Sequence, residues 1–302
     1  MWTQWQRLRE QLQEDVRSFG RVGTVAVTMT GELADCFSSR RDGVQHIVEC
    51  VEQTVGQSGE RSLYYATDGK FCSAGQTIEN WRHMAASNWH ALAKYVGLEI
   101  ASDVLLVDVG TTTTDVIAIS DGQVVTDSKT DMQRLRDLSL VYVGCRRTPV
   151  NALISSYNFR GCDVPVMNEM FATIDDARLW LGAEEESQHD LESADQKPRD
   201  RHHAKARLVR MIGLDDDEVS NQETDRIARQ ICLAASTRIR EASSRWSEVS
   251  KEDGSVWVLS GHGQDLVEVP ERVTVIDLRS RLPEGVSRVA PAWAVAQLAR
   301  SV

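Results

Sequence analysis

Apolar residues recur along this chain at two spacings, which predict alternating helices and strands. Near the N-terminus they recur at every third or fourth position, which is typical of an amphipathic helix over residues 2–19. The same spacing predicts further helices over 41–55, 81–96, 168–182, 200–213, 221–244 and 291–302. Short continuous apolar runs are typical of buried strands. They occur at 24–31, 62–66, 104–107, 116–119, 122–126, 256–263 and 273–277.

One polar segment separates two of these predicted strands. It reads Asp-Val-Gly-Thr-Thr-Thr-Thr-Asp over 108–115 and joins two apolar runs, which are therefore expected to form a hairpin. A glycine lets the backbone approach a bulky anion, and successive N–H groups and threonine hydroxyls can bind phosphate oxygens. The residues with this capacity are Gly110, Thr111, Thr112, Thr113 and Thr114.

The aspartates at the two ends of this segment indicate a metal site. Asp108 or Asp115 can hold Mg²⁺, directly or through water, because Mg²⁺ prefers carboxylate and phosphate oxygen. The alternative is a plain hairpin whose turn happens to be rich in threonine. That alternative is less favoured, because β-branched residues are poor turn formers.

Composition narrows the class of protein. The chain has 302 residues, 41% apolar and 26% charged, which is enough for one large globular core or two lobes. A net charge of −11 argues against a nucleic-acid partner. No apolar run reaches membrane-spanning length and no signal-peptide pattern is present, so we expect no membrane partner. The six cysteines show neither CxxC pairs nor zinc spacing, which is typical of reduced thiols in a cytoplasmic protein.

Two further segments are interpreted as structural, without a role in binding or catalysis. His83 and His90 lie seven residues apart on one face of the predicted helix 81–96. We interpret them as partly buried structural histidines, because no third metal ligand lies nearby in the sequence. Residues 183–203 contain three consecutive glutamates and several other polar residues, which predict a solvated loop.

A weak internal repeat predicts two lobes. Residues 24–31 resemble 255–261, and each segment is expected to lead into a helix, a short strand and a final helix. A three-strand meander over 104–127 precedes the second copy only. We therefore expect lobes at 1–100 and 101–302, with a helical insertion at about 145–245 of the second.

The segment 108–115 resembles the phosphate loop of the actin, sugar kinase and Hsp70 superfamily, and most nearly that of the hydantoinase A/oxoprolinase branch. Thr111 stands where that branch often has a second glycine. Motifs in the order expected for one subgroup span nearly the whole chain. They are Met29–Phe37, Thr67–Phe71, Ala85–Trp89, Tyr142–Pro149, Glu169–Thr173 and Ala204–Leu208.

This resemblance implies an α/β protein with the duplicated actin-like ATPase fold, which is ribonuclease H-like. The first half is expected to lack its N-terminal strands, and with them an upstream Asp-x-Gly-Gly loop, so that the chain begins partway through that half. The subgroup is linked to tetrahydromethanopterin one-carbon metabolism and the methanofuran pathway. The implied activity is a transferase that condenses an aminomethylfuran-methyl diphosphate with a tyramine-type phenol and releases diphosphate. The implied cofactor is Mg²⁺.

The chemistry of that reaction assigns roles to further residues. Arg146 and Arg147, just before a predicted helix start, can bind diphosphate oxygens, although they can equally be surface or ion-pair residues. A furan-methyl cation needs an aromatic or anionic wall, for which Trp89 and Glu32 are candidates. The phenol proton needs a base. The available carboxylates are Glu32, Asp35 and Asp115.

Other residues are expected to line the substrate cleft. Asp68 and Asn88 lie in the matched motifs. Gly261 and Gly263 flank His262 at the corresponding place in the second half, where relatives in the superfamily contact a nucleotide. Glu32 follows a glycine at a strand end, which is either a cleft position or the first turn of a helix.

Two alternative functions remain open on the sequence. One is ATP-dependent amide or hydantoin ring opening of the hydantoinase/oxoprolinase type, because that reaction also needs a phosphate loop. The other is a non-catalytic regulatory protein with a degenerate phosphate site, because only one of the two expected loops is present. Each enzymatic hypothesis expects a small phosphorylated molecule as the binding partner, and a homodimer is compatible with all three.

Overall fold

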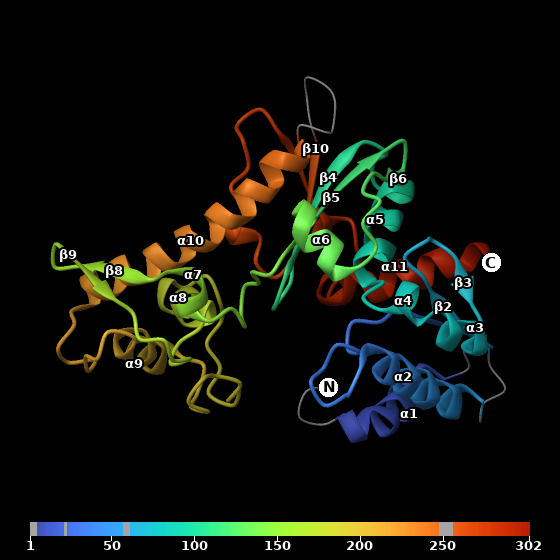
Figure 1. Ribbon diagram of the computed structural model, residues 1–302, viewed down its shortest axis with the longest axis horizontal. Coiled ribbons are helices and arrows are strands. Elements are labelled where there is room, and N and C mark those ends of the chain that lie inside the picture. Colours follow the sequence, from blue (N-terminus) through green and yellow to red (C-terminus); the bar gives the residue numbers. More distant parts are fainter. Residues whose placement is uncertain (1–4, 21–22, 57–60, 248–255) are drawn as a thin grey trace. The chain divides into compact units, whose positions relative to one another are not determined.

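The computed structural model describes residues 5–20, 23–56, 61–247 and 256–302 (Figure 1). The chain forms two compact units, and it passes between them more than once. Unit 1 consists of Met1–Leu106, Ile117–Asp137 and Ile276–Val302, and unit 2 consists of Val107–Val116 and Leu138–Val275. In the described residues, no helix has the length and apolar character needed to cross a bilayer.

Unit 1 contains a three-stranded sheet with the order β1-β2-β3. Strands β1 (Thr24–Val27) and β2 (Arg61–Tyr65) are parallel, and β3 (Phe71–Cys72) is antiparallel to β2. The α-helices of this unit are α1 (Leu8–Phe19), α2 (Arg40–Val55), α3 (Ala74–Glu79), α4 (Trp81–Met84), α5 (Asn88–Glu99), α6 (Asp131–Asp137) and α11 (Ala290–Leu298). Its 3-10 turns are η1 (Trp5–Arg7), η3 (Leu278–Ser280), η4 (Val286–Val289) and η5 (Ala299–Ser301).

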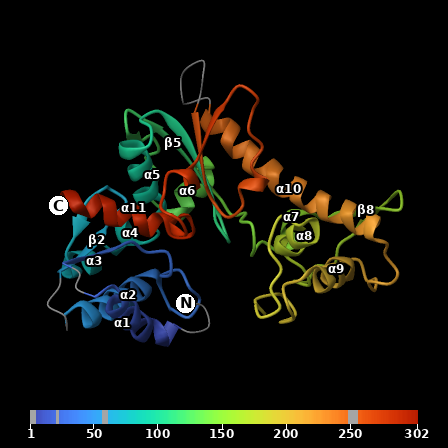
Figure 2. The ribbon, with the colours of Figure 1, turned by 180° about the vertical axis from the view of Figure 1, so that it is seen from behind.

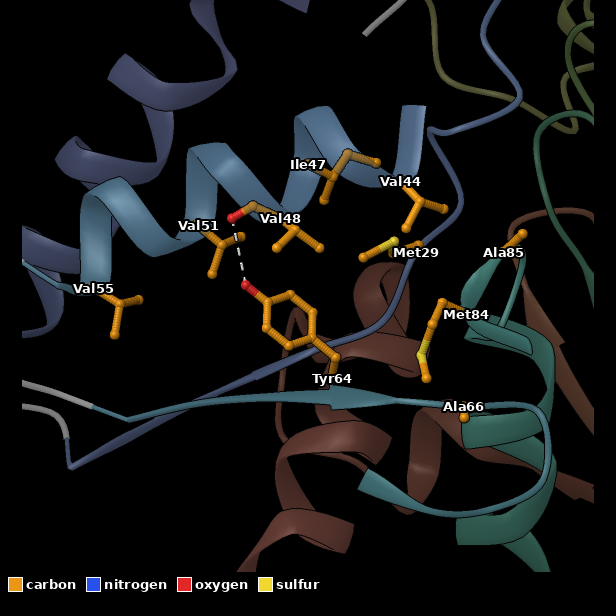
Figure 3. Close-up of a cluster of buried hydrophobic side chains, with 10 residues drawn as sticks. All are labelled: Met29, Val44, Ile47, Val48, Val51, Val55, Tyr64, Ala66, Met84 and Ala85. Atoms are coloured by element: carbon orange, nitrogen blue, oxygen red, sulfur yellow. Dashed lines mark hydrogen bonds between the residues drawn. The ribbon is translucent and has the colours of Figure 1, made fainter. Parts of the chain in front are cut away.

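Helices pack on both faces of this sheet, as the contacts of two consecutive tyrosines of β2 show. Successive strand residues point to opposite faces. Tyr64 therefore packs into the apolar cluster formed with Val48 and Val51 of α2, as Figure 3 shows. Tyr65 packs on the other side with Ala91 of α5 and Val295 of α11. Helices α5 and α11 lie side by side in Figures 1 and 2.

The single helix predicted over 81–96 is wrong, because α4 and α5 are separate helices. The backbone of Ala86 has a positive φ of 50°, and its N–H donates to the Glu32 carboxylate at 2.9 Å instead of to a helix carbonyl. His83 and His90 thus belong to different helices, and the prediction that His83 is partly buried is wrong, because its side chain is exposed. His90 is buried and its Nδ1 lies 2.9 Å from the Tyr65 hydroxyl, which agrees with a structural role.

The second sheet has six strands, with the order β11-β10-β4-β5-β6 and with β7 paired to β5. Its strands are β4 (Val104–Val109), β5 (Thr114–Ser120), β6 (Gln123–Val124), β7 (Leu140–Val141), β10 (Val256–Gly261) and β11 (Thr274–Asp277). The two strands predicted around the threonine-rich segment are confirmed as neighbours, β4 and β5.

Most of unit 2 is a helical region between β7 and β10. It contains α7 (Val150–Leu153), β8 (Ser156–Phe159), β9 (Cys162–Pro165), α8 (Ile174–Leu181), α9 (Arg201–Arg210) and α10 (Asn221–Ser247), and η2 (Gln264–Leu266) follows β10. The helix predicted from residue 168 begins only at Ile174, because Thr173 and Asp176 form a capping box. The hairpin β8–β9 was not predicted, because its turn is Arg160-Gly161, with φ of 52° and 80°, and not the usual Asn-Gly.

The solvated loop predicted over 183–203 is wrong in part. Arg199 is buried and donates to both carboxylate oxygens of Asp175, at 2.6 and 2.7 Å. Asp195 accepts from the buried Arg207 at 2.9 Å. Charged residues of this segment therefore form ion pairs with other parts of unit 2, which no local sequence pattern reveals.

The chain has a mixed α/β fold, as predicted, but the internal repeat is not reproduced in detail. The sixteen-residue helix α2 follows β1, whereas β10 is followed by the three-residue turn η2.

Candidate functional site

The threonine-rich loop links β4 to β5, and the turn after β7 holds it by its carbonyl groups. The Cys145 N–H donates to the carbonyl of Gly110 at 2.9 Å. The N–H groups of Arg146 and Arg147 both donate to the carbonyl of Thr111, at 3.1 and 2.9 Å. The loop carbonyls are thereby turned toward the protein, so the two arginines contact the loop through their backbone.

The turn after β10 holds the start of the same loop. The N–H groups of His262 and Gly263 donate to the carbonyl of Val109 at 2.9 and 3.2 Å. Gly261 has a φ of 83°, and a Cβ there would lie 2.2 Å from the same carbonyl oxygen. On the other side, a Cβ on Gly144 would lie 2.4 Å from the Thr112 nitrogen. Glycine is required at both places, because only a bare backbone fits so close to the loop.

The amide groups of the loop tip are left available. Within the described residues, the N–H groups and hydroxyls of Thr111, Thr112 and Thr113 donate to no other protein group. Successive N–H groups of a turn that have no protein acceptor can bind an anion. Thr114 does not belong to this group of residues. Its side chain is buried and its hydroxyl donates to the carbonyl of Val143 at 2.7 Å, so the prediction that Thr114 binds phosphate is wrong for this structure.

The predicted metal ligand lies at the base of the loop. Burial and the nearby carboxylate of Asp115 raise the pKa of Asp108 to about 7, while a hydrogen bond with Ser260 lowers it. Ser260 was not predicted, although it directly precedes Gly261. The two carboxyls repel each other when both are ionised, and a divalent cation would relieve that repulsion.

These residues fit Mg²⁺ and not a closed metal site. No group of three His, Cys, Asp or Glu side chains arranged to hold a metal ion occurs in the described part of the chain. Mg²⁺ usually takes one or two protein carboxylates and completes its shell with water and phosphate oxygens. Asp108, with Asp115 close by, satisfies that requirement.

The predicted role of the Arg146 side chain competes with an ion pair. Its guanidinium lies 2.7 Å from Asp190 and 3.3 Å from Glu192. The Arg147 side chain is exposed. Direct binding of diphosphate by either side chain stays a prediction.

Unit 1 carries the other predicted residues near the carboxyl ends of its parallel strands, the usual ligand-binding edge of such sheets. Glu32 is 2% exposed, and its Oε1 accepts from the Ala86 N–H at 2.9 Å. Among the described residues its Oε2 has no hydrogen-bond partner. Burial raises the pKa of Glu32. Hydrogen bonds from backbone N–H groups and the charge of Arg40 lower it and offset part of that rise.

The neighbouring candidates of unit 1 differ in their surroundings. Asp35 is exposed. Asp68 is exposed and accepts from the Lys70 N–H at 3.1 Å in the turn after β2. Asn88 is the half-buried first residue of α5.

Trp89 does not fit its predicted role as a wall against the substrate. The side chain is 2% exposed, and the Arg134 guanidinium lies 3.9 Å from the centre of its ring. The ring face is thus already occupied by a cation from its own unit. Trp89 is a core residue of unit 1 in this structure.

The sequence-predicted residues therefore form two groups. Unit 2 brings together the loop, Asp108, Asp115, Gly261, Gly263, Arg146 and Arg147, whereas unit 1 holds Glu32, Asp35, Asp68, Asn88 and Trp89. Sequence reasoning missed Arg178 of α8, whose side chain is 1% exposed and which donates to the carbonyls of Cys145 and His262. The available signal was one arginine inside an apolar stripe.

Comparisons with known proteins bear on the whole chain. The hydantoinase/oxoprolinase family model matches residues 23–302. A protein of Methanocaldococcus jannaschii named (4-{4-[2-(gamma-L-glutamylamino)ethyl]phenoxymethyl}furan-2-yl)methanamine synthase is 30% identical over 97% of this chain and 88% of its own length. The protein of the same name from Methanococcus vannielii is 29% identical over 69% of this chain and 96% of its own length.

A solved structure of a larger protein has a similar fold. The nucleotide-free structure of acetone carboxylase matches 97% of this chain with a TM-score of 0.50 and 11% identity. The chain spans 49% of that larger chain. From the family model and the relatives together, we conclude that the chain belongs to the hydantoinase/oxoprolinase family, as the loop and its accompanying motifs predicted.

Proposed function

We propose that this protein is a transferase that joins a furan-methyl group to a phenol oxygen and releases diphosphate. The observation that carries the proposal is the relative that is 30% identical over 97% of this chain. The name of that enzyme describes a product with a phenoxymethyl group on a furan. Such a product contains an aryl–O–CH₂–furan ether, so the bond made in its synthesis joins a phenol oxygen to a furan-methyl carbon.

The proposed donor is an aminomethylfuran-methyl diphosphate and the acceptor is a tyramine-type phenol. The bond between the methylene carbon and the diphosphate oxygen breaks, and its electron pair leaves with the diphosphate. The phenol oxygen forms the new bond to that carbon and loses its proton to a base. Atoms and charge balance without an oxidant, a reductant or ATP.

The loop in unit 2 supplies what the leaving group needs. The N–H groups of Thr111, Thr112 and Thr113, which have no acceptor within the described residues, are available to diphosphate oxygens. Donors fixed in place before the reaction stabilise the charge that develops as the bond breaks. Asp108, with Asp115 nearby, would hold Mg²⁺, which when bound neutralises charge on the diphosphate.

Glu32 is the favoured base among the predicted carboxylates. One of its oxygens is held by the Ala86 N–H, and the other has no partner within the part of the chain that is described. Glu32 and Asp115 are both buried, and Asp35 is exposed. Glu32 is favoured over Asp115 because Asp115 has a partner, whereas the Oε2 of Glu32 has none among the described residues.

The finer fold assignment is also a proposal. We assign the mixed α/β architecture to the actin-like ATPase type, with a duplicated core and a helical insertion in the second half. Supporting it are the family membership and the fold likeness to acetone carboxylase.

The test is a direct assay with purified protein. We would incubate it with MgCl₂, the aminomethylfuran-methyl diphosphate and γ-glutamyltyramine, and measure released diphosphate and the mass of the ether product. Equal amounts of both products support the proposal. Diphosphate without ether would mean hydrolysis of the donor, which contradicts it.

The two alternatives are outcomes of the same experiment. ATP hydrolysis that depends on an added hydantoin or oxoproline, with no ether formed, would establish the ring-opening reaction. No turnover of any of these substrates, together with no binding of inorganic diphosphate, would indicate a non-catalytic protein.

A further inference from the structure

Arg178 of α8 uses every donor of its guanidinium within unit 2. Its Nε and Nη2 donate to the two carboxylate oxygens of Asp265 at 3.0 and 2.8 Å. Its Nη1 donates to Glu184 at 2.9 Å. The two remaining N–H groups donate to the backbone carbonyls of Cys145 and His262, each at 3.1 Å. A guanidinium has five N–H donors in a planar fork, and all five have acceptors here.

Those two carbonyls belong to the turns that hold the phosphate loop. The N–H of Cys145 donates to the carbonyl of Gly110, and the N–H of His262 donates to the carbonyl of Val109. On each side, Arg178 is therefore connected to the loop through a single intervening residue, Cys145 or His262. It bridges the turn after β7 to the turn after β10, and within the described residues none of its hydrogen bonds goes to the threonines.

We propose that Arg178 is a positioning residue that fixes the two turns against the phosphate loop, so that the N–H groups of Thr111, Thr112 and Thr113 stay in place for diphosphate. The inference rests on the proposed function in one respect, namely that the loop binds diphosphate. It goes further in naming the residue that sets the loop geometry without contacting the ligand.

The charge of Arg178 cannot itself attract the ligand. The carboxylates of Asp265 and Glu184 more than neutralise it, and its side chain is only 1% exposed. The role is therefore geometric. Lysine would keep the charge but has three donors on a single nitrogen, which cannot reach two carbonyls and two carboxylates in one plane. Arg178→Lys thus separates charge from geometry.

Arg207 is a matched control for burial and charge. Its side chain is fully buried, and it donates to Asp176 of the same helix α8 at 2.7 Å and to Asp195 at 2.9 Å. In the described chain it makes no hydrogen bond to the turn after β7 or to the turn after β10. Arg207→Lys should therefore weaken the helical region of unit 2 without moving the loop.

The first measurement is steady-state kinetics with the diphosphate donor, alongside thermal unfolding of each variant. We expect Arg178→Lys to raise KM for the donor or lower kcat by about 10- to 100-fold, because misplacement by about 1 Å can have that effect. Arg207→Lys and Arg178→Lys should lower Tm by similar amounts. Arg207→Lys should leave KM and kcat within about threefold of wild type. Equal kinetic loss in the two variants, or none in Arg178→Lys, would overturn the inference.

The second measurement does not need turnover. Amide hydrogen exchange of the segment 107–116 should be faster in Arg178→Lys than in wild type and in Arg207→Lys. If wild type neither reacts nor binds inorganic diphosphate, the proposed function fails while exchange still decides the role of Arg178. If Arg178→Lys does not fold, Asp265→Asn serves instead, because it removes one anchoring charge and should speed exchange of the same segment to a smaller degree. Unchanged exchange in the folded variant would refute the positioning role.

Discussion

Glu32 in unit 1, which is buried, and Asp108 in unit 2, which is half-buried, are two carboxyl groups in different surroundings. Burial raises the pKa of both. Glu32 has one backbone N–H on one oxygen and no partner on the other among the described residues. Asp108 has a second carboxylate, Asp115, and a hydrogen bond with Ser260.

This difference separates two kinds of chemistry. A lone carboxyl with a raised pKa and a free oxygen is suited to moving a proton. Two neighbouring carboxyls beside a row of free N–H groups are suited to holding a cation together with an anion. Each carboxyl group is thus suited to a different step of the proposed reaction.

The largest expected effect is that of Asp108→Asn, which should abolish Mg²⁺-dependent turnover. Loss of a metal ligand should exceed the roughly 10- to 100-fold loss that follows removal of an outer partner of a metal site. The neutral amide also removes the repulsion from Asp115, so Tm at pH 8 should not fall. Turnover as a function of Mg²⁺ concentration, with thermal unfolding of the same samples, measures both.

Asp127→Asn is the control for Asp108→Asn, because Asp127 is an exposed carboxylate of unit 1. It should leave turnover unchanged. If Asp108→Asn retained the Mg²⁺ dependence of wild type, Asp108 would not be a metal ligand, and Asp108 and Glu32 would not differ in metal binding.

Glu32→Gln addresses the other half of the comparison. The amide oxygen can still accept from the Ala86 N–H, but it cannot take a proton, so kcat should fall by about 100-fold, within the usual contribution of a general base. Because burial raises the pKa of Glu32, the ionised form costs stability as pH rises, and the variant should have an equal or higher Tm at pH 8. Asp35→Asn, from the same segment, should be near wild type, and the opposite ranking of the two variants would identify Asp35 as the base.

Gly144→Ala should act on the loop alone. The added Cβ would lie 2.4 Å from the Thr112 nitrogen, so the loop must shift. We expect KM for the diphosphate donor to rise by about tenfold or more, because the N–H groups lose their alignment. Gly75→Ala is the control, because its Cβ meets nothing within 4 Å. Equal KM values for the two variants would show that this close approach is not needed for binding.

How much of this site the sequence could predict depends on the distance between partners along the chain. The hairpin β4–β5 and its anion-binding tip follow from a local pattern of apolar runs, glycine and threonine. The exclusion of Thr114 does not, because its hydroxyl bonds to a carbonyl 29 residues away. The role of Arg178 is still harder to predict from the sequence, because its side chain donates to a carbonyl 84 residues along the chain.

The fold follows the same rule. The strands and most helices have local signals, but the break between α4 and α5 does not. The sequence Ala85-Ala86-Ser87 favours a continuous helix, and the break exists because the Ala86 N–H bonds to Glu32, 54 residues earlier. Trp89 was similarly misjudged, because an aromatic motif residue looks the same whether it faces a substrate or the Arg134 guanidinium.

The smallest expected effect concerns Asp108 and is the pH dependence of Mg²⁺ binding. The pKa of Asp108 is about 7, well above the usual value of 3.8, so the folded protein holds a proton there between about pH 4 and pH 7 that the unfolded chain does not. Without Mg²⁺, this group makes stability decrease as pH rises through that window. Mg²⁺ must displace the proton, so its apparent Kd should weaken by about tenfold for each pH unit below 7. Mg²⁺ titrations of wild type at pH 6, 7 and 8 measure this slope. A flat profile would mean that Asp108 is already ionised at pH 6, so that neither burial nor Asp115 raises its pKa to about 7.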